Sequence, residues 1–200
     1  GGSELWLKKG GAAPICFRFE DTVRPGAKEA IAGLKARGFA VELLSGDREP
    51  AVRKLAGELG LDEWRAAARP DAKIARLEEL AAAGRKVVMI GDGLNDAPAL
   101  RAAHVSISPA DAADVSQTAA DFIFQGAKLD PVVETVDVAR QSQRLVVQNF
   151  ALAIGYNMFA VPLAVAGYVT PLVAALAMSS SSIIVIVNSM RLNRKQKDAA

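Results

Sequence analysis

Three short segments of this sequence combine glycine or proline with the polar side chains that phosphate chemistry uses. They are Ser45-Gly46-Asp47, Pro70-Asp71-Ala72-Lys73 and Gly91-Asp92-Gly93-Leu94-Asn95-Asp96. Glycine lets the backbone approach a phosphate, Ser45 can donate a hydrogen bond to a phosphoryl oxygen, and Lys73 can neutralise its charge. The hard carboxylate oxygens of Asp92 and Asp96 suit Mg²⁺. Each segment alone is typical of an ordinary turn, but three in order along the chain favour phosphoryl transfer.

Strands that alternate with helices must position these segments. The predicted helices are 25–38, 49–59, 70–84 and 110–117, and the predicted strands are 39–44, 64–68, 86–90, 104–108 and 121–125, after a hairpin of 4–8 and 14–19. Strands separated by helices of this length predict an α/β fold with a mostly parallel sheet covered on both faces. Ligands of such sheets bind at the carboxyl ends of the strands. Ser45 and Gly91 each come directly after the end of one of the predicted strands 39–44 and 86–90.

The composition excludes several other kinds of site. The chain has 200 residues, of which 51% are apolar, and that is enough to bury a core. Its single cysteine, Cys16, cannot form an internal disulfide, and no Cys/His cluster offers a self-contained zinc or iron–sulfur site. A net charge of +2 is not the field of a nucleic-acid-binding protein, so no nucleic-acid partner is expected.

One segment near the end of the sequence carries no charge. Residues 145–190, a run of 46, contain no Asp, Glu, Lys, Arg or His. As one helix they would extend about 69 Å, roughly twice the ~30 Å hydrocarbon core of a bilayer, so two membrane spans fit. The turn-forming segment 167–171 divides them into spans near 146–167 and 170–190, and Pro162 is expected to kink the first. The alternative is a buried helical hairpin in a larger soluble protein.

Basic residues flank the uncharged segment on both sides, at positions 140, 144, 191, 194, 195 and 197. Because Lys and Arg are enriched in cytoplasmic loops, both ends of the hairpin and the N-terminal part are expected to face the cytoplasm. The sequence from residue 130 has helical spacing with no breaker before the first span. We therefore expect one long stalk helix that connects the soluble part to the membrane.

Residues 91–100, GDGLNDAPAL, resemble the hinge signature of the P-type ATPases. The segment Ser45-Gly46-Asp47 is similar to their Thr-Gly-Asp motif, and PDAK at 70–73 to their Pro-x-x-Lys motif. FEDTVRPGA at 19–27 resembles the segment at which their phosphorylation domain resumes after the nucleotide domain. The resemblance covers most of the chain, from about residue 4 to 193. It implies a haloacid-dehalogenase-like parallel-sheet phosphorylation domain, a stalk helix and a two-helix transmembrane hairpin.

The resemblance also implies boundaries for these parts. Residues 1–128 would be a partial phosphorylation domain with the end of the nucleotide domain at its start. Residues 129–145 would be the stalk helix, 146–192 the two transmembrane helices, and 193–200 a cytoplasmic tail.

Polar residues within the predicted spans resemble the copper(I)-transporting subclass of this family. Tyr156-Asn157 is similar to its YN pattern, and Met178 with Ser181 and Ser182 to its MxxSS pattern. The whole region is most similar to the copper pumps encoded with nitrogen-fixation and high-affinity oxidase assembly genes. A methionine thioether is a soft ligand suited to Cu(I). Small and polar residues also pack membrane helices, so residue chemistry alone leaves the two roles open, and the resemblance favours Met178 as a ligand.

Several motifs of the family do not occur in this sequence, namely DKTGT with the phosphorylated aspartate, TGE, Cys-Pro-Cys and His-Pro. We therefore expect a C-terminal fragment that is inactive alone, since covalent catalysis needs its nucleophile. Asp21 follows an apolar strand, as phosphatase aspartates of related folds do, but Val23 stands where those have an acid or threonine. The resemblance makes Asp21 and Arg24 structural or hinge residues.

These motifs imply that the parent protein is a Cu(I)-exporting ATPase of the bacterial inner membrane that works through an aspartyl phosphate. The expected catalytic residues are Ser45, Gly46, Asp47, Lys73, Asp92, Asn95 and Asp96, with Mg²⁺ at Asp92 and Asp96 and Cu(I) at Tyr156, Asn157, Met178, Ser181 and Ser182. ATP would bind mostly to a missing domain. Expected partners are the lipid bilayer, the missing N-terminal part of the pump, and a copper chaperone or oxidase assembly factor.

Two other functions remain open at this point. One is a membrane-anchored, Mg²⁺-dependent phosphatase of the same haloacid-dehalogenase-like fold, which would use Asp21 as its nucleophile. The other is a non-catalytic membrane fragment that binds metal or a partner.

Overall fold

The computed structural model describes residues 3–11, 13–19 and 22–192. Asp21, the alternative nucleophile, lies outside these residues, as does the tail from 193. The chain divides into two compact units, Gly1–Val133 and Glu134–Ala200. The boundary between them falls inside a single long helix.

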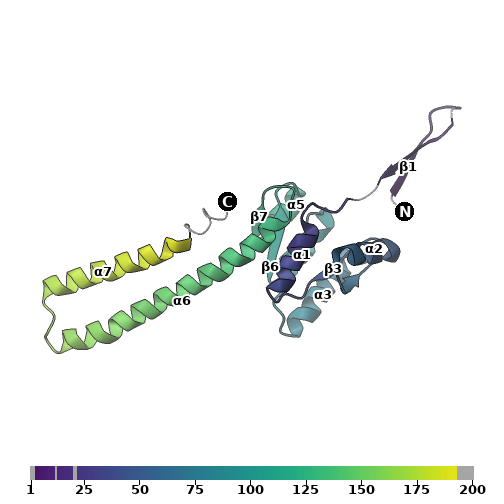
Figure 1. Cartoon of the computed structure of the whole chain (residues 1–200). Coiled ribbons are helices and arrows are strands. Elements are labelled where there is room, and N and C mark those ends of the chain that lie inside the picture. Colours follow the sequence, from purple (N-terminus) through teal and green to yellow (C-terminus); the bar gives the residue numbers. More distant parts are fainter. Residues whose placement is uncertain (1–2, 12, 20–21, 193–200) are drawn as a thin grey trace. The chain divides into compact units, whose positions relative to one another are not determined.

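The first unit begins with the predicted hairpin, in which β1 (Ser3–Leu7) pairs antiparallel with β2 (Ile15–Phe19). Helices and strands then alternate as α1 (Ala27–Ala36), β3 (Glu42–Leu44), α2 (Glu49–Leu59), β4 (Glu63–Arg65), α3 (Pro70–Ala82), β5 (Val88–Ile90), the 3-10 turn η1 (Leu94–Asp96), α4 (Ala97–Ala102), β6 (Val105–Pro109), α5 (Asp114–Ala119) and β7 (Phe122–Phe124) (Figure 1).

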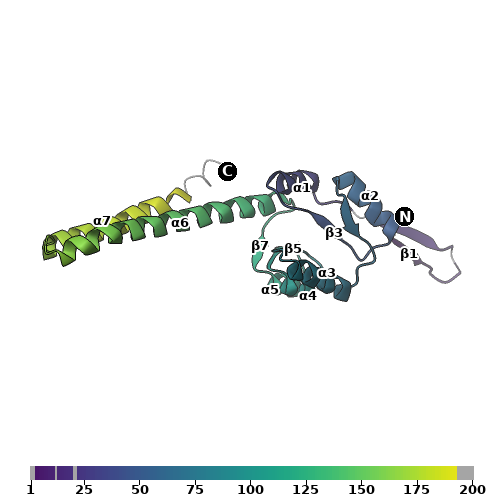
Figure 2. The same cartoon turned by 90° about the horizontal axis from the view of Figure 1, so that it is seen from below.

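Strand pairing in this alternating part is parallel, as predicted, but it forms two sheets. β3 pairs with β4, and β5, β6 and β7 form a second sheet in that order. Figure 2 shows β3 with α1 and α2, and β5 and β7 with α3, α4 and α5. The carboxyl ends of β3 and β5 lead into the two glycine-containing segments.

Prolines and glycines set the helix bounds where the prediction was closest. α2 has Pro50 in its first turn and ends at Gly60, whose φ of 66° is left-handed and suits glycine. The predicted helix 110–117 was wrong at its start, because residues 110–113 form a turn in which Ala112 N bonds to Pro109 O at 3.1 Å. α4 was not predicted as a helix, since its first four residues belong to the GDGLNDAPAL segment.

Two clusters of apolar side chains form the core of this unit. One joins Leu77 of α3, Met89 of β5 and Leu100 of α4. The other joins Ile107 of β6 and Phe124 of β7 with Val132, which lies in the first turn of the following helix. The core thus holds the sheet between helices and anchors the start of that helix.

The second unit contains most of the helix α6 (Asp130–Val165) and all of α7 (Pro171–Ser189). Both helices are long and apolar enough to cross a membrane. Figures 1 and 2 show that they run antiparallel. The stalk and the first predicted span form one helix of 36 residues, and Pro162 lies inside it near its end. The fold class predicted from the sequence is confirmed.

Candidate functional site

The loop after β5 is shaped by the close approach of Asp96 to two glycines. A Cβ atom added to Gly91 would lie 2.9 Å from the Cβ of Asp96, and one added to Gly93 would lie 3.3 Å from Asp96 Oδ2. Ser116, which is fully buried in α5, donates from Oγ to the carbonyl of Gly93 at 2.6 Å. The glycines therefore let the chain fold tightly around one carboxylate.

Lys73 and Asp96, two of the predicted site residues, meet in this loop. Lys73 Nζ donates to Asp96 Oδ1 at 2.6 Å, and the two side chains are only 11% and 15% exposed. Lys73 lies in the first turn of α3, where its backbone N bonds to Arg69 O. This pairing holds the amino group of Lys73 in a defined place beside the glycine loop.

Asp92, the other predicted Mg²⁺ ligand, points toward water with 58% of its side chain exposed. Arg24 Nη2 donates to Asp92 Oδ2 at 3.3 Å and to Asp111 Oδ1 at 3.0 Å. The hydrogen bond to Asp111 is the main cause that raises the pKa of Arg24, and the same bond lowers the pKa of Asp111. The resemblance implied that Arg24 is a structural or hinge residue, whereas no motif in the sequence pointed to Asp111 or Ser116.

Ser45 and Asp47, which follow β3, bond to each other. Ser45 Oγ donates to Asp47 Oδ2 at 2.7 Å, and Asp47 N donates to Ser45 Oγ at 3.2 Å. Gly46 is exposed. Across the parts of the chain that the structure describes, no hydrogen bond or ion pair joins this segment to residues 91–96. Asn95 is exposed on η1. The predicted catalytic residues thus form two groups. One follows β3, and the other consists of Lys73 and the residues that follow β5.

The residues after β5 fit a hard divalent cation in part. The carboxylate of Asp92 is accessible, and that of Asp96 lies in the glycine cradle with one oxygen bonded to Lys73. Within the described residues, no group of three or more His, Cys, Asp and Glu side chains is placed to hold a metal ion. This chain can therefore offer Mg²⁺ two carboxylates, and further ligands would have to be water or other groups.

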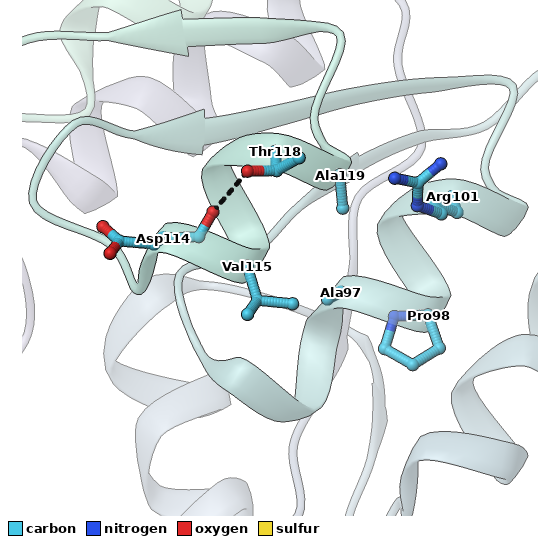
Figure 3. A pocket seen from close by; sticks show the side chains of 7 residues that line it. All are labelled: Ala97, Pro98, Arg101, Asp114, Val115, Thr118 and Ala119. Carbon is cyan, nitrogen blue, oxygen red and sulfur yellow. Dashed lines mark hydrogen bonds between the residues drawn. The ribbon is translucent and has the colours of Figure 1, made fainter.

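A shallow pocket of about 500 Å³ lies between α4 and α5, next to this loop (Figure 3). Its wall is mostly apolar and includes Pro98 and Val115, with Arg101 and Asp114 at its rim. Thr118 Oγ1 donates to the carbonyl of Asp114 at 2.8 Å. None of the predicted site residues lines it, so it is separate from the candidate phosphate site.

Three of the five predicted metal ligands on α6 and α7 form side-chain hydrogen bonds with their own helices. Asn157 Nδ2 donates to Ala153 O at 2.9 Å. Ser181 Oγ and Ser182 Oγ both donate to Met178 O, at 2.9 and 3.1 Å. The Met178 side chain is 69% exposed. These hydroxyl and amide oxygens keep lone pairs for another ligand, because the groups act as donors in the bonds described.

The five predicted ligands lie at similar depths along the two helices. Tyr156 lies nine residues before Val165, and Ser181 lies ten residues after Pro171. At 1.5 Å per residue, these positions are about 13.5 Å and about 15 Å from the connecting segment. Asn157, Met178 and Ser182 fall within a turn of them. The hairpin thus places these five residues at about one depth.

Similarity to known proteins extends over both units. The family model of the haloacid dehalogenase-like hydrolases matches residues 8–104. Nitrogen fixation protein FixI of Rhizobium meliloti (strain 1021) is 52% identical over 179 residues, which are 90% of this chain and 24% of that protein. The probable copper-exporting P-type ATPase V of Mycobacterium tuberculosis (strain ATCC 25618 / H37Rv) is 38% identical over 178 residues, 89% of this chain and 23% of that protein.

A solved structure has a similar fold. The crystal structure of a zinc-transporting PIB-type ATPase matches 90% of this chain and 31% of that one, with 30% identity and a TM-score of 0.79. The chain is homologous to the heavy-metal P-type ATPases. It spans about a quarter of the length of the curated relatives it matches. The predicted resemblance to heavy-metal P-type ATPases is confirmed, while the domain boundaries and the roles of individual residues stay predictions.

Proposed function

We propose that this chain forms part of an ATP-driven Cu(I) export pump that works through an aspartyl phosphate. The observation that carries the proposal is the pairing of Lys73 with Asp96 in a glycine cradle beside the exposed Asp92 carboxylate. The similarity to a probable copper-exporting P-type ATPase supports the choice of copper as cargo. The pump would lie in the bacterial inner membrane, with the first unit and both ends of the hairpin in the cytoplasm.

The residues of the first unit would hold and neutralise the transferred phosphoryl group. Lys73 would offset phosphoryl charge at the loop, and Ser45 Oγ and the backbone at Gly46 can donate hydrogen bonds to phosphoryl oxygens. Asp92, with Asp96, would hold Mg²⁺, and bound Mg²⁺ would supply charge that offsets the phosphate. ATP itself would bind mostly outside these 200 residues.

The acceptor aspartate would come from the rest of the pump. Within the described residues, β3 pairs only with β4, and β5 pairs only with β6, so each has one edge without a strand. One further parallel strand could pair with both edges and would end between Ser45 and Asp92. We propose that the acceptor lies at the end of such a strand, which would explain why the two groups of site residues do not touch here.

The second unit would complete a copper path. Tyr156, Asn157, Met178, Ser181 and Ser182 lie at similar depths, and Met178 offers the soft thioether that Cu(I) prefers. Cysteines carried by another span of the pump would join them. Phosphorylation would switch access to this site and its affinity, and such coupling requires that the two states bind Cu(I) differently.

The experiment joins this chain to the upstream part of its gene and measures ATP hydrolysis with and without Cu(I). We expect Cu(I)-stimulated hydrolysis that Asp92→Ala abolishes and that Asp62→Ala, a change at a carboxylate 95% exposed on another segment, leaves intact. Met178→Ala should lower the number of Cu(I) ions bound, whereas Met190→Ala should not. Mg²⁺-dependent phosphatase turnover by the 200-residue chain alone, lost in Asp21→Asn, would instead support the anchored phosphatase.

A further inference from the structure

Neutral side chains join α6 to α7 at the end of the hairpin away from the connecting segment. Asn188 donates from Nδ2 to Asn149 Oδ1 at 2.9 Å, and Asn149 donates from Nδ2 to Ser189 Oγ at 2.9 Å. Asn188 Nδ2 also lies 3.4 Å from Gln148 Oε1. Asn149, Asn188 and Ser189 are named the polar clasp below. None of the three belongs to the phosphate site or to the proposed copper site.

Further hydrogen bonds join the polar clasp to one residue of α7 and to one residue just after it. Arg191 Nη1 donates to Asn188 Oδ1 at 3.1 Å, and Ser189 Oγ donates to Val185 O at 2.9 Å. Both asparagines are half-buried. Each amide therefore donates and accepts, which is the condition under which polar groups are tolerated near hydrocarbon. The two bonds that Asn149 makes, with Asn188 and with Ser189, each join one position of α6 to one position of α7.

The polar clasp sets which residues of the two helices lie at the same depth. Apolar helix faces have little preference between a helix and lipid, whereas hydrogen bonds need a defined distance and angle. Asn149 lies seven residues before Tyr156, and Ser189 lies seven residues after Ser182. Seven residues are about two helical turns, so the register that closes the clasp also brings Tyr156 level with Ser182.

We propose that Asn149, Asn188 and Ser189 are positioning residues that fix the axial register of α6 and α7. A slip of α7 by one turn would break the clasp and move Ser182 about 5.4 Å along the helix axis, away from Tyr156. The effect on copper rests on the proposed function, but the effect on register does not.

The register is tested on the full chain in lipid nanodiscs by measuring the distance between two spin labels. Labels replace Leu152 on α6 and Ile186 on α7, both exposed, in a Cys16→Ser background. We expect a narrow distance distribution with the clasp intact. Asn188→Leu should broaden it or shift its maximum, because a slip of one turn, ~5.4 Å along the helix axis, changes the separation of the labels. A distribution that Asn188→Leu leaves unchanged would overturn the proposal.

Two further variants make the result specific to the clasp. Ser180→Ala removes a hydroxyl that bonds to Leu176 O within its own helix, and it should leave the distribution narrow. The exchange of Asn149→Ser with Ser189→Asn keeps an amide and a hydroxyl opposite each other and should also stay narrow. If Asn188→Leu does not accumulate, Asn149→Ala takes its place. An exchange variant as broad as the broken clasp would contradict the proposal.

A second measurement separates this inference from the proposed function. In the pump joined to its upstream part, Asn188→Leu should raise the Cu(I) concentration for half-maximal ATP hydrolysis more than it lowers the maximal rate. A pump that responds to Cu(I) with an unshifted half-maximal concentration would refute the positioning role. A pump without substitutions that shows no response to Cu(I), while the label distances behave as expected, would contradict the proposed function. That result would leave the positioning role of the polar clasp supported.

Discussion

The missing side chain of Gly91 determines how closely Asp96 can approach the end of β5. In Gly91→Ala the new Cβ would meet the Asp96 Cβ at 2.9 Å, closer than side-chain atoms tolerate. We expect the loop to shift and the Lys73–Asp96 bond to lengthen, at a cost of roughly 1–3 kcal/mol in the free energy of unfolding. Urea unfolding of the first unit, followed by tryptophan fluorescence, measures this cost.

The matched control for Gly91→Ala is Gly57→Ala in α2. A Cβ at Gly57 would meet no atom within 4 Å, and the position is inside a helix. Alanine there should raise the free energy of unfolding by about 0.5–1 kcal/mol. Opposite signs at the two glycines are the expected result, and equal effects would contradict a steric role for Gly91.

Arg24 connects the loop after β5 to the loop after β6, and the charge of Asp111 reports on that link. The hydrogen bond from Arg24 lowers the pKa of Asp111, so this group favours the folded state at neutral pH. That contribution is lost as the pH falls through the lowered pKa. Arg24→Gln should raise the pKa of Asp111 toward its ordinary value, which carboxyl carbon NMR in the acid range measures.

Lys35→Gln is the control for this titration, because Lys35 pairs with Asp62 in another part of the unit. It should leave the pKa of Asp111 unchanged. A pKa of Asp111 that is the same with and without Arg24 would show that the two side chains do not interact in solution.

Among the elements, the sequence predicted best those whose ends are marked by local residues such as proline and glycine. α2 was found within its predicted bounds because Pro50 and Gly60 mark its ends. The division of the parallel strands into two sheets could not be predicted, since strand order depends on pairing between distant segments and leaves no periodicity. The same applies to the site. Lys73 and Asp96 lie in recognisable motifs. Asp111 lies in none, and it is 87 positions from Arg24, its partner.

The first turn of α7 is capped by the side chain of Thr170. Thr170 Oγ1 accepts a hydrogen bond from Val173 N at 3.4 Å, and Pro171 occupies the first turn. Thr170→Ala should destabilise this helix end by about 1 kcal/mol, because an N-terminal amide loses its partner. Hydrogen exchange of the Val173 amide in nanodiscs should become faster. Thr170→Ser keeps the acceptor and should retain the protection, and equal exchange in both variants would contradict the cap.

At the scale of the whole molecule, charged residues are distributed unevenly between the two units. Residues 1–144 carry nearly balanced charge, whereas residues 145–190 carry none. α6 belongs to both units, since Val132 packs into the core of the first unit and the rest of the helix continues into the uncharged segment. One continuous helix therefore runs from the first unit into the second, and the proposed pump would need such a link to couple phosphorylation to transport.

The orientation proposed for the hairpin from its basic flanks can be measured in cells. If both ends are cytoplasmic, the connecting segment must lie outside the inner membrane. In a Cys16→Ser background, Tyr168→Cys, at an 80% exposed position of that segment, should react with a membrane-impermeant maleimide in intact cells. Gln143→Cys on α6 should react only after lysis. The reverse pattern would invert the hairpin, and reaction of both cysteines only after lysis would mean that α6 and α7 do not cross the membrane.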